Sequence, residues 1–286
     1  MPPPTLDRGP AGGVPRGEER FTHPSLGGLR LHRVRWGAPG PRKLVLLHGA
    51  GAGAHWWEHL APSLVAEGRE VVALDFRGHG SSDHPKTLSP HGFREDLQAL
   101  LLDLGAPDAV LVGHSLGAHT ALEVAATQPG AAGLVLVDPG RGAAARQRRA
   151  TRLALLLTRS YATREQAIAR FRFVPAADAA EESLRVSIAQ RSVRLQPDGR
   201  FGFHFDPRWI QVLGGSLPDL SRVRCPVLLV RGARSPLLTE EGARELVAQL
   251  PHCRRVDVEE AGHHVLVDQP QVLVRLIQDF LEEIRG

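Results

Sequence analysis

The sequence predicts an α/β fold in which a mostly parallel β-sheet is flanked by helices and interrupted once by an insertion. The first observation is that short apolar runs alternate with longer stretches of helical periodicity from about Arg30 to Val137. That alternation is typical of a parallel sheet covered by helices. The second observation is that the alternation stops at about Arg141 and resumes after Pro218. A length of 286 residues suits one large domain of this kind or two small ones.

Buried strands are expected where short runs of β-branched and other apolar residues end in loops rich in Gly, His or Asp. These runs are residues 44–47, 71–74, 109–112, 134–137, 226–230 and about 255–258. The segments between them are long enough for helices and carry apolar residues at mixed spacings of three and four. Helices are expected at residues 55–67, 93–104, 116–127, 240–250 and 271–284.

Residues 141–218 are expected to form a helical insertion in one domain whose core comprises residues 20–140 and 219–286. In the insertion the strand pattern disappears, residues 143–172 look helical, and arginine outnumbers the acidic residues. Exposed arginines are usually part of a solvated surface. They also support the hypothesis that the insertion draws anionic substrates towards a site beneath it.

Composition excludes several other classes of protein. A hydrophobic fraction of 42% and a charged fraction of 23% are those of a folded globule, not of a disordered chain. No uninterrupted apolar run reaches the length of a membrane span, about 18 residues. The net charge of +4 comes from scattered arginines, so neither nucleic acid nor a membrane is expected as a partner. Cys225 and Cys253 fit neither a disulfide framework nor a zinc-ligand spacing.

Residues 1–19 are rich in Pro and Gly and are expected to form a flexible tail. This segment lacks the apolar core of a secretory signal. We therefore expect a cytoplasmic protein, present as a monomer or a homodimer.

A candidate nucleophile lies in the segment Gly113-His-Ser-Leu-Gly117, between a predicted strand and a predicted helix. A sharp turn from strand to helix strains the backbone of the central serine and lifts its hydroxyl above the sheet edge. Glycine is needed on both sides because side chains there would collide with neighbouring elements. Ser115 is therefore the predicted nucleophile; the alternative is an incidental serine in a glycine-bordered turn.

A serine nucleophile requires hydrogen-bond donors for the oxyanion that forms when it attacks. Small residues in Leu47-His-Gly-Ala-Gly-Ala-Gly53 allow backbone N–H groups to approach a ligand closely. The N–H groups of Ala50 and Leu116 are predicted to form the oxyanion hole. A phosphate-binding loop is the alternative, but the Gly-Lys-Ser/Thr ending of such loops is missing.

The nucleophile also requires a base, and the order Ser, acid, His along the chain places that base late in the sequence. The segment Ala261-Gly-His-His follows the last predicted strand, so its loop lies at the same sheet edge as Ser115. His263, directly after the glycine, is the predicted base in preference to His264.

From about residue 25 to its end, the chain resembles the α/β-hydrolases. Four motifs carry the resemblance in the order of that family: His48-Gly49, Asp75-Phe-Arg-Gly-His-Gly-Ser-Ser-Asp83, Gly113-His-Ser-Leu-Gly117 and Gly262-His263. The resemblance implies the α/β-hydrolase fold, with a helical cap inserted after the strand that ends near Asp138. It also implies a Ser-His-acid triad that uses no metal and no other cofactor.

The acid of the triad departs from the commonest pattern of the family. Many relatives carry it in the loop after the strand that matches residues 226–230, but here Pro236 stands where the carboxylate is expected. The end of the preceding strand is the alternative position, as in the haloalkane dehalogenases, and it holds Asp138. Asp138 is therefore the predicted acid. Alternatively, Asp138 only caps a turn, and Ser235 or a water orients His263 weakly, or the triad is a dyad.

Further candidates concern the substrate pocket. An aromatic patch at residues 201–209 is expected to line an acyl or aromatic pocket. One of Trp56 and Trp57 is expected in the pocket wall and the other in the core. The residues predicted to line the pocket are Gly49, His114, Trp57, Phe203, Trp209 and His264. Asp268 is interpreted as a helix-start residue.

These residues predict a serine hydrolase that cleaves a small-molecule carboxylic ester or lactone through an acyl-enzyme. The same residues could serve thioester hydrolysis, C–C bond hydrolysis or perhydrolysis, and the fold does not choose among them. The alternative from another class is a slow or non-catalytic ligand-binding protein without an efficient acid, which Pro236 motivates.

Overall fold

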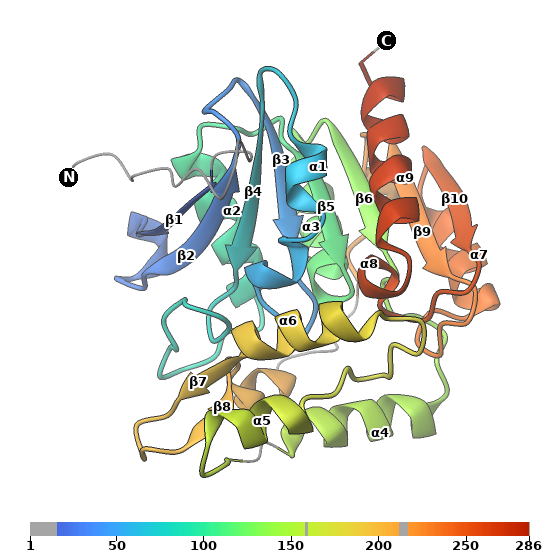
Figure 1. Cartoon of the computed structure of the whole chain (residues 1–286). Coiled ribbons are helices and arrows are strands. Elements are labelled where there is room, and N and C mark those ends of the chain that lie inside the picture. The colour runs from blue at the N-terminus through green and yellow to red at the C-terminus, as the bar shows by residue number, and fades with distance from the viewer. Residues whose placement is uncertain (1–15, 158–159, 212–216, 286) are drawn as a thin grey trace.

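The computed structural model describes residues 16–157, 160–211 and 217–285, and its centre is an eight-stranded sheet in the order β1-β2-β4-β3-β5-β6-β9-β10 (Figure 1). The strands are β1 (Arg16–Phe21), β2 (Leu31–Trp36), β3 (Arg42–Leu47), β4 (Arg69–Asp75), β5 (Val110–His114), β6 (Gly133–Val137), β9 (Val227–Gly232) and β10 (Cys253–Val258). All neighbours from β4 to β10 pair in parallel. The six predicted buried strands are β3, β4, β5, β6, β9 and β10, so the predicted fold class is confirmed.

The two strands at the amino-terminal edge were not predicted, and both pair antiparallel. β1 carries four charged residues and no apolar run, which is why its sequence, Arg-Gly-Glu-Glu-Arg-Phe, does not read as a strand. An ion pair from Arg16 to Glu58, with an N–O distance of 2.7 Å, fastens it to the core. The prediction of a flexible tail over residues 1–19 is therefore wrong for residues 16–19, which belong to the sheet. Residues 1–15 of that prediction lie outside the described residues.

Two helical layers cover the sheet, because successive strand side chains point to opposite faces. Val45 and Leu47 of β3 pack in one layer, and Leu44 and Leu46 pack in the other. The first layer contains α2 (Gly92–Asp103), α3 (Leu116–Thr127) and α7 (Glu240–Gln249); the second contains α1 (Ala61–Leu64), α8 (Val265–Asp268) and α9 (Pro270–Glu283). Within the described ranges, no helix combines the length and the apolar character that a membrane crossing requires.

The segment between β6 and β9 holds a separate group of elements. These are α4 (Ala145–Leu156), α5 (Arg164–Arg170), α6 (Glu182–Ser192), the antiparallel strands β7 (Val193–Leu195) and β8 (Phe201–Phe203), and η3 (Pro207–Gln211). Figure 1 shows α4, α5 and α6 beyond the carboxyl ends of the sheet strands. We call this group the cap. The chain enters it at the carboxyl end of β6, so it covers the edge at which Ser115 lies.

Two predicted helices are shorter than expected. Residues 143–172 form α4 and α5, with a break between Leu156 and Arg164. Residues 55–67 form only η2 (Ala54–Trp57) and the one-turn α1, which begins anew at Ala61-Pro62. Proline suits the first turn of a helix but cannot continue one, because it has no N–H to donate.

Candidate active site

Ser115 occupies a strained turn between β5 and α3. Its φ of 50° and ψ of −110° are rare for a residue with a side chain. A Cβ added at Gly113 would lie 2.4 Å from the backbone of Gly117, and one added at Gly117 would lie 2.4 Å from the Leu47 carbonyl oxygen. Glycine at both positions therefore allows the turn to form, and Ser115 stays partly exposed at its tip.

The loop after β3 presents one backbone donor next to this turn. The N–H of Gly51 donates to His79 Nε2 at 3.3 Å, and the N–H of Ala52 donates to the Gly49 carbonyl at 3.2 Å. Among the described residues, no backbone acceptor takes the N–H of Ala50. Leu116 opens α3, where the first N–H groups have no partner within the helix. These are the two amides predicted for the oxyanion hole.

Buried histidines and an aspartate hold this loop. His48 donates through Nδ1 to the Gly49 carbonyl at 2.7 Å and accepts the Phe76 N–H through Nε2 at 3.1 Å. Burial lowers the pKa of His48, which keeps the ring in the neutral form that this pair of contacts needs. Asp75 accepts the Ala54 N–H at 2.6 Å and so fixes the far end of the loop.

The predicted base and the predicted acid are in contact. His263 donates through Nδ1 to Asp138 Oδ1 at 2.7 Å, and both side chains are buried. Asp138 follows β6 with a φ of 46°, a second strained residue at the same sheet edge. Its other oxygen, Oδ2, accepts the Gly232 N–H at 3.0 Å. This arrangement leaves the second ring nitrogen of His263, Nε2, without a proton in the neutral ring.

The loop after β9 supports this carboxylate. Ser235 donates its hydroxyl to Asp138 Oδ1 at 2.7 Å and accepts the N–H groups of Leu237 and Leu238. Because those two amides donate to the hydroxyl oxygen, the hydroxyl proton is directed to Asp138. Ser235 therefore contacts the predicted acid, a role that sequence reasoning did not assign to it. Its place in the loop directly after β9, three residues beyond Gly232 and with no acidic residue before Glu240, is the signal that could have indicated it.

Asp268 anchors the loop that carries His263. Its carboxylate accepts the Gly262 N–H at 2.8 Å and the Ala179 N–H of the cap at 3.3 Å. Burial raises the pKa of Asp268. The residue lies at the end of α8, not at a helix start as the sequence indicated.

The turn at Ser115, the loop after β3 and the loop that carries His263 meet at His114. His114 precedes Ser115 and donates through Nε2 to the His263 carbonyl at 3.0 Å. A Cβ added at Gly49 would lie 2.6 Å from His114 Nδ1 and 3.4 Å from the Ser115 Cβ. The predicted residues Ser115, His263, Asp138 and Gly49 are thus gathered in one place.

A cavity of about 370 Å³ extends from the loop after β3 into the cap. Its lining is largely apolar and includes Ala50, Gly51, Trp56, Ala154, Leu155, Leu157, Tyr161, Arg170, Phe171, Arg172, Val174, Ser192, Phe203 and Phe205. Phe203, which was predicted to line the substrate pocket, is part of this lining.

Two aromatic residues lie elsewhere than expected. Trp57 is fully buried in the core behind the sheet, and Trp56 lines the cavity in its place. Trp209 is also buried and packs against His79, with a distance of 5.3 Å between ring centroids. Of the other predicted pocket residues, Gly49, His114 and His264 are buried and do not line the cavity.

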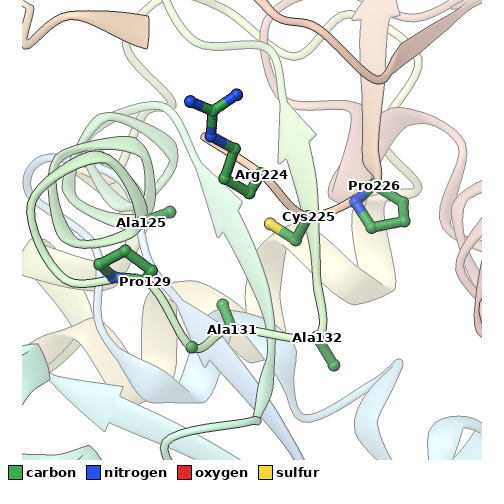
Figure 2. A pocket seen from close by; sticks show the side chains of 8 residues that line it. Ala125, Pro129, Ala131, Ala132, Arg224, Cys225 and Pro226 are labelled. Carbon is green, nitrogen blue, oxygen red and sulfur yellow. The ribbon is translucent and has the colours of Figure 1, made fainter. Parts of the chain in front are cut away.

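A second cavity, of about 270 Å³, lies at the opposite end of the sheet (Figure 2). Its lining includes Pro129 and Ala132 just before β6, and Arg224 and Cys225 just before β9. Ser115, Asp138 and His263 follow the carboxyl ends of β5, β6 and β10, so this cavity at the amino ends of β6 and β9 is separate from the site described above.

Comparison with known proteins identifies the family of this chain. A family model described as "Alpha/beta hydrolase family" matches residues 44–276. The chain belongs to the alpha/beta hydrolase family. This match confirms the resemblance drawn from the four motifs.

Relatives within the alpha/beta hydrolase family carry hydrolase names. The chain is 32% identical over 262 residues to "Esterase Rv0045c" of Mycobacterium tuberculosis, covering 88% of this chain and 86% of the relative. It is 29% identical to "sn-1-specific diacylglycerol lipase ABHD11" of Xenopus tropicalis, covering 86% of this chain and 79% of that protein. The chain is thus a hydrolase similar to esterases and lipases.

A solved structure shows the same alpha/beta hydrolase fold. "E-2-(Acetamidomethylene)succinate Hydrolase" superposes with a TM-score of 0.81 at 24% identity, and the match covers 93% of this chain and 99% of that one. The likeness extends over nearly the whole of both chains, which supports the alpha/beta hydrolase fold of the chain.

Proposed function

We propose that this hydrolase cleaves a carboxylic ester or lactone through an acyl-enzyme formed on Ser115. The observation that carries the proposal is the hydrogen bond from His263 Nδ1 to Asp138 Oδ1, at 2.7 Å. It fixes the tautomer in which Nε2 of His263 has a lone pair and can act as a base. The esterase and lipase names of the relatives support the same class of bond.

The proposed reaction begins with attack of Ser115 Oγ on the substrate carbonyl. His263 Nε2 takes the hydroxyl proton, and buried Asp138 stabilises the imidazolium that forms. The negative charge that develops on the carbonyl oxygen is stabilised by the N–H groups of Ala50 and Leu116. Each such donor contributes on the order of 10²-fold to 10³-fold in rate, since it is in place before charge develops.

Collapse of the tetrahedral intermediate breaks the ester C–O bond, and His263 returns its proton to the departing alkoxide. A water then enters, His263 Nε2 removes one of its protons, and the hydroxide attacks the acyl carbon. The second intermediate releases the carboxylic acid, and the proton held by His263 goes back to Ser115 Oγ. Atoms and charges balance with water as the only other reactant.

The cavity supports an acyl or aromatic substrate group of moderate size. Leu155, Phe171 and Phe203 provide apolar wall, and Ala50 connects that wall to the proposed oxyanion hole. Arg170 and Arg172 add two cationic groups to the lining. This combination favours an apolar ester or lactone that carries a negative charge away from the reacting carbonyl.

The alternative of a slow ligand-binding protein was motivated by Pro236 in place of an acid. The hydrogen bond between His263 and Asp138 supports a triad whose acid follows β6 and not β9. This contact favours ester hydrolysis over binding alone. Thioester and C–C bond hydrolysis and perhydrolysis would use the same residues, and a panel of substrates separates them.

Labelling with a fluorophosphonate probe tests the proposal before a substrate is known. The probe phosphonylates only a serine whose hydroxyl is activated by a base. We expect one label on the wild type, mapped to Ser115 by mass spectrometry, and none on Ser115→Ala. Ser221→Ala is the matched control, because this exposed serine lies far along the chain and should not affect labelling. Absence of label on folded wild type, or label retained on Ser115→Ala, would overturn the assignment.

A further inference from the structure

Exposed leucines gather at the carboxyl end of α4, on the outer surface of the cap. Five large apolar side chains are exposed in the part of the chain that the structure describes, and three of them are here: Leu153 at 54%, Leu156 at 42% and Leu157 at 60%. α4 contacts η3, and none of its residues is buried. In Figure 1, α4 lies beyond α6 as seen from the sheet. Single exposed leucines are normal, but a group of three is typical of an interaction surface.

Arginines occupy the preceding turns of the same helix. The sequence of α4, Ala-Arg-Gln-Arg-Arg-Ala-Thr-Arg-Leu-Ala-Leu-Leu, holds four arginines and no acidic residue. Arg148 and Arg152 donate to backbone carbonyls of the segment between β6 and β9. Arg146 and Arg149 are exposed. α4 is therefore a cationic helix with an apolar carboxyl end.

Two of the arginines and two of the leucines share one face of α4. Residues three and four positions apart lie on the same side of a helix. Arg146, Arg149, Leu153 and Leu156 follow one another at spacings of three, four and three, and all four are exposed. We call these four residues the outer stripe. The less exposed residues lie on the other side of the helix, towards the rest of the cap: Gln147, Thr151 and Leu155.

The outer stripe adjoins an opening of the larger cavity. Leu157, which directly follows α4, lines the cavity and is also exposed. The cavity therefore reaches the protein surface next to the stripe. Arg170 and Arg172, both exposed, belong to the same lining and add positive charge there.

We propose that the outer stripe docks this hydrolase on the surface of an anionic lipid bilayer. Arginines are attracted to the negative headgroups, and leucines enter the boundary between headgroups and acyl chains. No membrane was expected as a partner when the arginines of the whole chain were considered together, but the cap concentrates four of them on one helix beside exposed leucines.

Docking in this orientation would place the opening at Leu157 against the lipid. An apolar ester could then pass from the bilayer into the cavity without crossing water. This passage rests on the proposed function, because it leads to Ser115. The binding to lipid does not, because it depends only on the outer stripe.

Charge disfavours the other occupants of this surface. In a symmetric dimer the same patch meets itself, and α4 offers no acidic residue to its own copy. Residues 1–15 carry one acid, Asp7, and one arginine, Arg8, so they bring no net negative charge. An acidic protein would satisfy the arginines but not the leucines. A bilayer with anionic headgroups offers both negative charge and an apolar interior.

Co-sedimentation with lipid vesicles tests the docking without any substrate. We expect the wild type to bind mixed vesicles of phosphatidylglycerol and phosphatidylcholine about tenfold or more tightly than vesicles of phosphatidylcholine alone. The binding should weaken as salt screens the charges. Absence of binding to the anionic vesicles would overturn the proposal.

Two double variants test the two halves of the outer stripe. Leu153→Ser with Leu156→Ser, and Arg146→Gln with Arg149→Gln, should each weaken binding to the anionic vesicles about tenfold or more. These side chains are exposed and do not line the cavity, so folding and the pocket should be preserved. Unchanged binding in either variant would overturn the proposal.

Matched controls remove the same groups outside α4. Leu102→Ser replaces a leucine of α2 that is 57% exposed. Arg222→Gln with Arg275→Gln removes two charges from exposed positions of η4 (Leu220–Arg222) and α9. Both controls should bind the vesicles as the wild type does. If the arginine control loses as much binding as the arginine variant, net charge alone explains the binding and the proposal is wrong.

Two further measurements separate the other occupants. Binding of polyglutamate as tight as that of anionic vesicles would assign the surface to an acidic protein and overturn the proposal. A dimer in sedimentation velocity that Leu153→Ser with Leu156→Ser dissociates would assign it to a second copy and overturn it as well. We expect weak binding of polyglutamate and no effect of this variant on the oligomeric state.

Activity tests the passage from bilayer to cavity. Turnover of a long-chain ester held in anionic vesicles should fall about tenfold in Leu153→Ser with Leu156→Ser, in proportion to the lost binding. Turnover of a short ester dissolved in water should be unchanged. Equal turnover of the vesicle-borne ester by variant and wild type contradicts the passage. If the vesicles bind as expected but the fluorophosphonate labels no serine, the proposed function fails while the docking surface stands.

Discussion

Ser235 and His263 donate to the same oxygen, Oδ1 of Asp138, each over 2.7 Å. The two donors come from different loops, one after β9 and one after β10. A carboxylate that accepts two such hydrogen bonds, together with the Gly232 N–H on Oδ2, is fixed in orientation. The loop after β9, where the family resemblance led us to expect an acid, therefore contributes a supporting hydroxyl to Asp138, the proposed acid, which directly follows β6.

Replacing the acid should remove most of the activity without unfolding the protein. Asp138→Asn keeps the shape of the side chain, but an amide can donate to His263 Nδ1 and so favours the wrong tautomer. We expect kcat to fall by about 10³-fold to 10⁴-fold, as in the serine-protease case. Turnover of an activated ester, with circular dichroism as a check on folding, measures this effect.

Three variants serve as controls for the acid. Ser235→Ala removes one of the two hydrogen bonds to Oδ1, and we expect a loss of about tenfold or less. Glu240→Gln and Asp268→Asn should also cost much less than Asp138→Asn. A mild effect at Asp138 beside a severe one at any of these positions would transfer the role of acid to that residue.

The nucleophile turn should tolerate no side chain at Gly117. Gly117→Ala places a Cβ 2.4 Å from the Leu47 carbonyl oxygen, a contact that only a backbone shift can relieve. We expect the free energy of unfolding, measured by urea denaturation, to fall by more than about 4 kcal/mol. The matched control is Gly140→Ala, whose Cβ would meet its nearest neighbour at 3.6 Å and should change stability by less than about 1 kcal/mol. Equal losses in the two variants would contradict this account.

Stability should fall with rising pH because of a buried histidine beside the oxyanion loop. His32 Nδ1 lies 2.8 Å from Asp75 Oδ2. Burial opposes the charged ring, but the hydrogen bonds to Asp75 and Glu18 outweigh it and raise the pKa of His32 to about 9. The unfolded ring has a pKa of about 6.5, so between pH 6.5 and 9 the folded state binds more protons than the unfolded state. The stabilisation is complete below pH 6.5 and is lost as pH rises through 9.

Urea denaturation at a series of pH values measures this loss. For the wild type we expect the free energy of unfolding to drop by up to about 3 kcal/mol between pH 6.5 and 9.5. His32→Asn should be less stable at pH 6.5 and should lose much less over the same range. Parallel curves for the two proteins would show that His32 does not carry the effect.

The cationic lining of the cavity should favour anionic substrates. Arg170 and Arg172 line the cavity, and Arg172 donates to the backbone carbonyls of Ala169 and Phe171. At low salt we expect kcat/KM for an ester with a distal carboxylate to exceed that of a neutral ester of equal length by about threefold to tenfold. The difference should narrow as salt screens the charges.

Substitution at one arginine separates local attraction from the overall charge of the cap. Arg170→Gln should reduce the preference for the anionic ester at low salt. Arg149→Gln removes the same charge from α4, outside the cavity lining, and should leave the preference largely intact. If both variants behave alike, the attraction comes from the whole cap; if neither ester is preferred at any salt concentration, the arginines are surface residues only.

The central fold could be predicted from the sequence because its strands are apolar on both faces. Leu44-Val-Leu-Leu47 has no polar alternation, which is the pattern of a strand buried in a parallel sheet. β1 and β2 escaped prediction because charged residues, four in β1 and two in β2, leave neither strand an uninterrupted apolar run. In the structure those charges are paired across strands, as Arg33 is with Glu19 at 2.6 Å, and such pairing depends on contacts far apart in the chain.

The members of the candidate site could be predicted where a local sequence pattern marks them. Ser115 and His263 follow from glycine-bordered segments at strand ends, and Asp138 follows from its place at the end of a neighbouring strand. The contact of Ser235 with Asp138 spans 97 positions of sequence, and no local pattern contains it. The choice between Trp56 and Trp57 also depends on packing, because adjacent residues in a 3-10 helix differ in which face they present.

The glycine contacts around the nucleophile turn restrict how the enzyme could be re-engineered. Cβ atoms at Gly113, Gly117 or Gly232 would lie 2.4 Å or less from neighbouring backbone atoms. None of these three glycines can therefore be replaced by a residue with a side chain without a shift of the backbone. The cap side chains that face the cavity, such as Leu157 and Phe203, meet open space and not packed backbone. A mutant library meant to alter substrate range while preserving turnover therefore belongs in the cap, where size and polarity can be varied independently of the residues proposed to carry out the chemistry.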